Sequence, residues 1–113
     1  MNVQIFGMKK SFDSKKAERY FKERGIKYQF VDMKEKGLSK GEFHSVCQAV
    51  GGYEKLIDPK CKDKNLLALI QYLSEEDKKE KILENQKIIR TPIVRNGKQA
   101  TVGYEPDVWK DWK

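Results

Sequence analysis

The sequence predicts an α/β protein with the element order β-α-β, a helical insertion and β-β-α, arranged around a mixed four-stranded sheet. Three observations support this prediction. Residues 3–33 have the pattern of a strand, a helix and a strand, residues from about 38 to 88 have helical periodicity, and residues 92–102 have the pattern of a β-hairpin. Because 113 residues suffice for one modest core, we expect a single domain over residues 1–113.

The first third of the chain predicts a parallel β-α-β unit. Val3–Phe6 alternates like a short strand, and apolar residues at helical spacing predict a helix from about Asp13 to Arg24. Gly25 suits the left-handed residue that ends such a helix. Tyr28–Met33 has strand composition, and two strands joined by a helix should run parallel. The apolar residues of this helix are Ala17, Tyr20 and Phe21.

The insertion predicts several helices. Ser39 and Glu42 match a capping box, and the helix that they begin should end at Gly51-Gly52. Leu66–Leu73 predicts a second helix that is buried over much of its surface, and Ser74 should begin a third helix at the surface. The apolar residues of the first insertion helix are Phe43, Val46, Cys47 and Val50.

The last third of the chain returns to strands. Two strand-like segments flank an Asn-Gly pair, which accepts the positive φ values of a type I′ turn and therefore indicates a β-hairpin. Pro106 suits the first position of a final helix, in which we expect Val108 and Trp112 to share a face. The two strand segments are Pro92–Arg95 and Lys98–Val102.

Composition limits the classes of function. The net charge of +7 fits either anionic partners or a well-solvated surface without a ligand. No apolar run approaches the roughly 18 residues of a membrane span and no signal-peptide core follows Met1, so we expect a cytoplasmic protein without a membrane partner. Two cysteines and one histidine predict neither a disulfide framework nor a metal site. Aromatic and basic residues are not interleaved, so no direct nucleic-acid partner is expected.

The loop that enters the first helix holds the main candidate site. The free amides and the dipole of a helix N-terminus at Ser11 would stabilise a thiolate or an oxyanion. A serine hydroxyl is nearly inert in thiol chemistry, and the only histidine, His44, lies on another predicted helix, so a serine nucleophile lacks a base. Ser11 is better explained as a helix cap or an anion hydrogen-bond donor, with Asp13 and Ser14 as competing caps.

Lysines crowd the same loop. Lys9 and Lys10 precede Ser11, and Lys15 and Lys16 follow it in the first turn of the predicted helix. These lysines can form an anion site with the helix N-terminus, or they can be a solvated surface. Each lysine in the first turn opposes the helix dipole at a cost of about 0.3–1 kcal/mol, which slightly favours a ligand.

The order of elements is that of a thioredoxin-like fold with extra helices between its two halves. With that order, with the loop before Lys15-Lys16-Ala17 and with the segments Arg90–Val94 and Val102–Tyr104, the chain resembles the arsenate reductase (ArsC)/Spx family over essentially its full length. The resemblance implies a thiol-oxidoreductase lineage whose catalytic cysteine corresponds to Ser11, and in Spx-type members a second cysteine that corresponds to Ser14. It implies no bound cofactor, with glutathione or glutaredoxin as the thiol partner.

The chain departs from the family pattern at the expected anion site. Arsenate-reducing members have an arginine immediately before the proline of the hairpin strand, a proline that is usually cis. Here Thr91 precedes Pro92, as in glutaredoxin-like proteins, where this backbone pairs with a thiol substrate, and Arg90 should point to the other side. Lys60 at best matches the family's other arginine and lacks its bidentate fork. The anion- or thiol-substrate-binding set that results is Lys9, Lys10, Phe12, Ser14, Lys60, Arg90, Thr91 and Pro92.

The two cysteines should differ in their surroundings. Cys47 lies on the apolar stripe of its helix and is expected in the core. Cys61 lies among three lysines that would lower its pKa, which makes it a candidate reactive thiol. The default interpretation of Cys61 is an incidental surface cysteine, and the reactive thiol is the alternative to it.

These features predict an arsenate-reductase-like thiol oxidoreductase that is redox-inactive as it stands, because Ser11 occupies the nucleophile position. Its ligand would be a small oxyanion, a thiol substrate or a glutaredoxin-type protein. One alternative is an Spx-like regulator that binds the RNA polymerase alpha subunit, with Gly51-Gly52 in the comparable region, although two glycines also simply end a helix. A further alternative is an inactive relative that binds an anion or a peptide.

Overall fold

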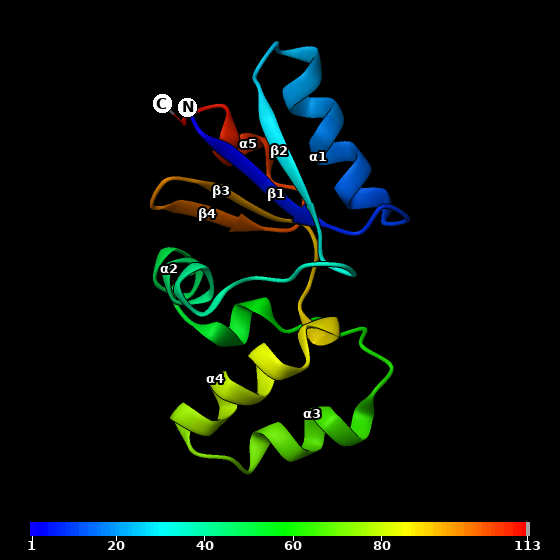
Figure 1. Cartoon of the computed structure of the whole chain (residues 1–113), viewed down its shortest axis with the longest axis vertical. Helices are drawn as coiled ribbons and strands as arrows, with labels where there is room; N and C mark the ends of the chain where they lie inside the picture. The colour runs from blue at the N-terminus through cyan, green and yellow to red at the C-terminus, as the bar shows by residue number, and fades with distance from the viewer. Residues whose placement is uncertain (113) are drawn as a thin grey trace.

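A computed structural model describes residues 1–112 and contains a mixed four-stranded sheet in the order β2-β1-β3-β4 (Figure 1). β1 pairs in parallel with β2 and antiparallel with β3, and β4 lies antiparallel beside β3 at one edge. This topology confirms the predicted α/β, thioredoxin-like fold. The strands are β1 (Val3–Gly7), β2 (Tyr28–Asp32), β3 (Ile93–Asn96) and β4 (Gln99–Val102).

One face of the sheet is covered by α1 (Phe12–Glu23) and the short α5 (Pro106–Trp109) (Figure 1). The indole of Trp109 is buried between them and donates a hydrogen bond from Nε1 to Oγ1 of Thr101 at 2.7 Å. The expectation that Val108 and Trp112 share a helix face is wrong, because α5 ends at Trp109 and Val108 is exposed. The buried residues of this layer are Val3, Ile5, Ala17, Tyr20, Phe21, Val94, Trp109 and Trp112.

The opposite face packs against the helical insertion. Its core includes Phe6 and Ile93 from the sheet and Val46, Leu56 and Ile82 from the insertion. The insertion contains α2 (Lys40–Val50), α3 (Lys64–Gln71), α4 (Glu75–Glu84) and the 3₁₀ turns η1 (Tyr53–Leu56) and η2 (Gln86–Ile88).

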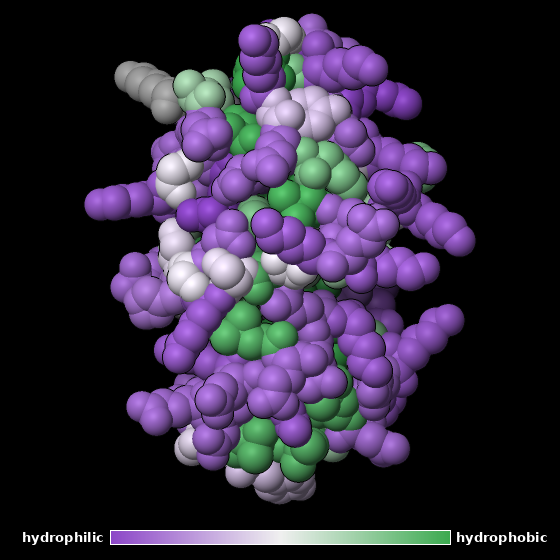
Figure 2. Space-filling model, viewed as in Figure 1, coloured by the Kyte–Doolittle hydropathy of each residue, from purple (hydrophilic) through white to green (hydrophobic). Residues whose placement is uncertain are grey.

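The prediction that the helix near Leu66–Leu73 is buried over much of its surface is wrong. Ile70 is the one fully buried side chain within α3, whereas Leu69 is 46% and Tyr72 87% exposed. The space-filling view is mostly hydrophilic, and hydrophobic atoms gather at its lower end over α3 and α4 (Figure 2). The two helices form a small outer layer that leaves Leu69 and Tyr72 exposed to solvent.

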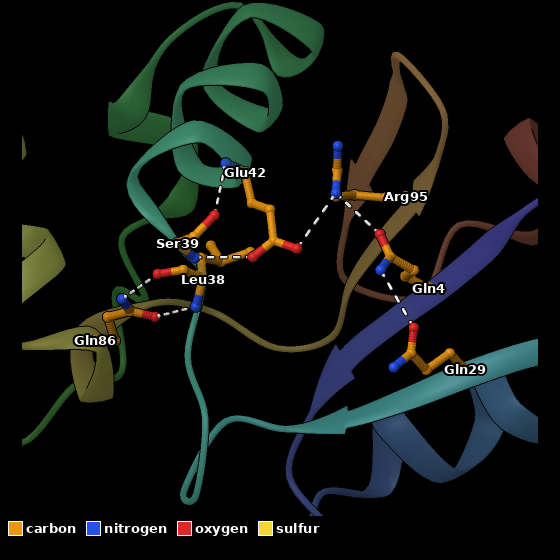
Figure 3. Close-up of polar contacts among 7 residues, drawn as sticks. All are labelled: Gln4, Gln29, Leu38, Ser39, Glu42, Gln86 and Arg95. Carbon is orange, nitrogen blue, oxygen red and sulfur yellow. Dashed lines mark hydrogen bonds and ion pairs between the residues drawn. The ribbon is translucent and has the colours of Figure 1, made fainter.

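Side-chain hydrogen bonds and an ion pair join the two ends of the insertion to each other and the start of α2 to the sheet (Figure 3). The side-chain amide of Gln86 donates to the carbonyl of Leu38 at 2.8 Å and accepts from the amide of Leu38 at 2.7 Å. Arg95 on β3 donates to Gln4 on β1 at 2.9 Å and lies 3.6 Å from a carboxylate oxygen of Glu42 on α2. These contacts fix the start of α2 relative to the sheet and confirm the capping box that begins it.

The register of the sheet brings three chain segments to one end. Phe6 lies opposite Ile93, and Ile93 lies opposite Val102, so the loop after β1, the residue before β3 and the turn after β4 meet there. The amide of Gly103 donates to the carbonyl of Pro92 at 2.8 Å, which joins the last two of these segments. Any site formed by the loop that contains Ser11 therefore lies beside Pro92.

Candidate functional site

Ser11 is the N-cap of α1, and it is the residue that the structure selects among the three competing candidates. Its backbone is extended, with φ −76° and ψ 128°, and its Oγ accepts a hydrogen bond from the amide of Ser14 at 3.3 Å. Its own amide donates to the carbonyl of Met8 at 2.9 Å, which closes the turn before the helix. The half-buried hydroxyl therefore lies at the positive end of the helix dipole.

Two further amides face the same end of α1. Among the described residues, the amides of Phe12 and Asp13 donate no hydrogen bond. Unpaired amides at a helix N-terminus are a general anion-binding arrangement. The Asp13 carboxylate lies in the same first turn and would compete with a ligand for these amides.

Ser14 lies inside the protein. Its side chain is 0% exposed, and its Oγ accepts a hydrogen bond from the amide of Met8 at 3.2 Å. Gly7 makes room for it, because a Cβ at Gly7 would lie 2.5 Å from Oγ of Ser14. The expected ligand-binding role of Ser14 therefore does not fit this conformation, in which its buried hydroxyl accepts a hydrogen bond from the loop.

An aromatic and cationic wall stands beside Ser11. The Phe12 ring is 74% exposed, and the ammonium of Lys16 lies 5.1 Å from its centre and 5.4 Å from the centre of the Tyr104 ring. Tyr104 follows Gly103, so this wall joins α1 to the segment bonded to Pro92. Lys9 and Lys10 are exposed in the turn before Ser11. Sequence reasoning counts Lys16 among the loop lysines but does not find its contact with Tyr104, since the two residues are far apart in the chain.

Thr91 and Pro92 form the opposite side of the site. The peptide bond between them is cis, as the resemblance implies, and Pro92 is fully buried. Thr91 is half-buried, and its backbone amide and carbonyl make no hydrogen bond with any described residue. A free amide and carbonyl in an extended segment can pair with the backbone of a bound peptide or peptide-like thiol.

Arg90, Lys60 and Cys61 lie outside this arrangement. The guanidinium of Arg90 lies against Gly103 in a groove beside β4, and Arg90 forms no hydrogen bond or ion pair with Ser11. Lys60 is an exposed turn residue whose amide donates to Asp58 Oδ1 at 2.9 Å. Cys61 is half-buried and packs against the core between the sheet and the insertion.

Other chemistries receive little support from the described part of the chain. Residues 1–112 contain no group of three or more His, Cys, Asp or Glu side chains that could hold a metal ion. His44 is exposed on α2, across the sheet from α1, so it cannot act as a base for Ser11. Cys47 is buried, and this burial raises the pKa of its thiol. None of the described helices is long and apolar enough to span a membrane.

Residues 6–112 match the ArsC family. The chain belongs to the ArsC family. A curated relative, the global transcriptional regulator Spx 2 of Oceanobacillus iheyensis, is 27% identical over 100% of this chain and 94% of its own length. Both the family match and this relative extend over nearly the whole chain, so the elements that form the site lie within the shared region.

Solved structures of similar proteins have the same fold. An arsenate reductase from Vibrio cholerae is 25% identical, with a TM-score of 0.82 and coverage of 96% of this chain and 94% of that one. An ArsC family related protein from Bacteroides fragilis is 19% identical, with a TM-score of 0.87 and coverage of 100% and 98%. The second likeness concerns the fold alone. ArsC family membership therefore agrees with the resemblance inferred from the loop, the hairpin and the Gly103-Tyr104 turn.

Proposed function

We propose that this protein is a redox-inactive ArsC family member of the arsenate-reductase-like thiol-oxidoreductase lineage. In this proposal Ser11 occupies the position of the nucleophilic cysteine, and the site still binds a small oxyanion or a thiol-bearing ligand. The observation on which the proposal rests is the position of Ser11 Oγ at the N-terminus of α1, beside the unpaired amides of Phe12 and Asp13. That environment suits a thiolate, and serine cannot supply one.

The ligand would lie between the two sides of the site. The amides at the start of α1, with Lys9 and Lys10, would hold its anionic group, and the exposed ring of Phe12 would cover its apolar part. The free backbone of Thr91 would pair with a peptide-like thiol such as glutathione, or with the chain of a glutaredoxin-type protein. Because such thiol partners act in reducing compartments, the proposed location is the cytoplasm.

Restoring a thiol tests the proposal. In the S11C variant, the thiolate would attack one sulfur of a small disulfide R–S–S–R, form a mixed disulfide with one RS group and release the other as RS⁻. A glutathione thiolate would then attack the sulfur of the bound RS group, release glutathione–S–S–R and regenerate the thiolate of the variant. We expect S11C to reduce small disulfides, and arsenate in a glutaredoxin-linked assay, while the native chain and S11A do not.

A C61S background isolates the new thiol, because Cys61 is the more exposed of the two native cysteines. In that background, the iodoacetamide alkylation rate of S11C measured against pH should give a thiol pKa below the free value of about 8.5. An ordinary thiol pKa together with no reductase activity would show that the start of α1 is not built for sulfur chemistry.

The relation to Spx supports a second candidate function. The similarity to an Spx regulator covers 100% of this chain, and a regulator needs no thiol at position 11 to bind a partner. In this case the purified C-terminal domain of the RNA polymerase alpha subunit should be retained on immobilised protein, and S11A should retain it equally well. A failure of retention, together with gain of activity in S11C, would favour the reductase lineage.

A further inference from the structure

β4 has an open backbone edge. It is the outermost strand, and among residues 1–112 the sheet pairs it with β3 alone. Asn96 and Gln99 flank the two-residue hairpin turn, and the amide of Gly103 bonds to the carbonyl of Pro92 around the Ile93–Val102 pair. Hydrogen-bonded and non-hydrogen-bonded pairs alternate along an antiparallel ladder, so Ala100 and Val102 lie in the non-hydrogen-bonded pairs. Their amides and carbonyls therefore point away from β3. Unpaired groups of this kind are a template for another strand.

A groove of about 530 Å³ lies along this edge. Val50 and Lys55 come from α2 and η1 on one face of the sheet, and Val108 comes from α5 on the other. The groove therefore wraps around β4, and it can receive side chains from both faces of an added strand. Its apolar contacts are Val50 and Val102, which are half-buried, and Val108, which is 43% exposed.

Three charged residues line the groove, two cations and the carboxylate of Glu105, and neither cation is paired with a carboxylate. Lys55 and Arg90 are both exposed, and neither forms an ion pair with any described residue. Arg90 is nevertheless held in place, because its amide donates to the carbonyl of Leu56 at 2.7 Å and its guanidinium lies against Gly103. A Cβ at Gly103 would come within 3.0 Å of that guanidinium. A positioned guanidinium with free donors suits a carboxylate, which it can bind with two parallel hydrogen bonds.

We propose that β4 binds an extended, acidic peptide segment of a partner protein, which adds to the sheet as a fifth strand. The backbone of the segment would pair with Ala100 and Val102. A carboxylate side chain would bind Arg90 and Lys55 on the face of α2, and the alternate apolar side chain would contact Val108 on the face of α5. Strand addition takes its affinity from the backbone and its specificity from pockets for alternate side chains, and the groove offers both. This surface does not depend on the chemistry at Ser11.

A model peptide tests the proposal on the native chain. The probe is a fluorescein-labelled peptide of three Glu-Val repeats, measured by fluorescence anisotropy, with three Lys-Val repeats as the charge control. Two further Glu-Val peptides are N-methylated at alternate residues, one at the odd and one at the even positions. We expect one methylated series to lose binding and the other to keep it, because alternate amides of an added strand face β4. We also expect amide NMR shifts to concentrate at Ala100–Val102.

R90Q provides the matched test of charge, and K98Q is its control, because Lys98 is an exposed lysine in the hairpin turn outside the groove lining. R90Q should weaken binding of the Glu-Val peptide about tenfold, whereas K98Q should not change it. Equal binding of both methylated series, equal effects of R90Q and K98Q, or binding weaker than about 1 mM would overturn the proposal. Dimerisation in sedimentation that protects the Ala100 and Val102 amides without peptide would instead assign this edge to a second copy, which also overturns it.

Discussion

The hydroxyl of Ser11 should have a measurable and limited role in stability, and the caps of other helices calibrate it. Ser11 Oγ accepts from the amide of Ser14 at 3.3 Å, a long distance for a hydrogen bond between an amide and a hydroxyl. Ser74 caps α4 in the same way, with its Oγ 3.3 Å from the amide of Asp77. Ser39 has a full capping box, with bonds of 3.1 Å and 2.8 Å.

These geometries predict the order of the losses. Replacing an N-cap serine by alanine costs about 0.5–2 kcal/mol, so S11A and S74A should lie at the low end, near 0.5–1 kcal/mol. S39A should cost more, about 1–2 kcal/mol, because the bond that it removes, from the amide of Glu42 to Ser39 Oγ, is shorter at 3.1 Å than the 3.3 Å bonds of the other two caps. An unfolding entropy of about 240 cal/mol/K for 113 residues makes 1 kcal/mol equal to a Tm change of about 4 °C. S11A should therefore lower Tm by about 2–4 °C.

Urea unfolding and thermal scans at neutral pH measure the three variants, and S11D serves as a rescue because aspartate also caps helices. We expect S11D to recover the loss of S11A. A loss in S11A well above that in S74A, about 2 kcal/mol or more, would show that Ser11 does more than cap its helix. No loss in S11A, with a normal loss in S74A, would show that the 3.3 Å contact at Ser11 does not form in solution.

Three further predictions concern the surroundings of the site and the insertion. G7A should destabilise the fold by about 1–3 kcal/mol in urea unfolding, because its Cβ would lie 2.9 Å from Cβ of Ser14; an unchanged midpoint would contradict this packing. A thiol reagent at neutral pH should label Cys61 in the native chain and the buried Cys47 after unfolding, and C61S should remove the native reaction; native labelling that persists in C61S would refute this. Burial, with a hydrogen bond to Glu75, raises the pKa of Tyr53 from 10.0 to about 12. The folded state holds this proton more tightly than the unfolded state, so the free energy of unfolding should fall between pH 10 and 12. Y53F should flatten that fall in urea titrations, and an equally steep fall in Y53F would contradict the prediction.

The sequence predicts the strands and their order along the chain well because the relevant signals are local. The Asn-Gly pair at 96–97 specifies the hairpin, and the alternation in Val3–Gly7 specifies a strand with one side chain layer on each face. Ser39 and Glu42 form the expected capping box for the same reason. Each of these signals depends on residues within a few positions of one another, so tertiary packing has little opportunity to override them.

The errors occur where burial depends on distant elements. The apolar composition of α3 predicts a buried helix, but α4 packs against one side of α3 and leaves Leu69 and Tyr72 in solvent. Helical spacing pairs Val108 with Trp112, but the chain leaves the helix at Trp109 and packs the two indoles together instead, with ring centres 6.5 Å apart. Periodicity gives the faces of a helix, and it does not give what lies opposite each face.

The position of Ser14 shows how a family pattern can mislead about one residue. A polar residue three positions after Ser11 fits the second thiol position of Spx-type relatives, yet its hydroxyl binds the amide of Met8 and is closed off by Gly7. The close approach of Gly7 and Ser14 joins a strand to a helix, which a pattern of spacings cannot reveal.

Serine at position 11 caps its helix but offers no thiol for redox chemistry. It satisfies the amide of Ser14, so the fold needs no thiol there. Three neighbouring features leave groups available to a ligand: the exposed ring of Phe12, the unpaired backbone of Thr91 and the unpaired amide of Asp13. Unpaired amides are the rule in the first turn of a helix and a single exposed ring is common on a protein surface, so these features permit ligand binding without requiring it. In the proposed function these groups would contact the ligand, and none of them requires a thiol at position 11.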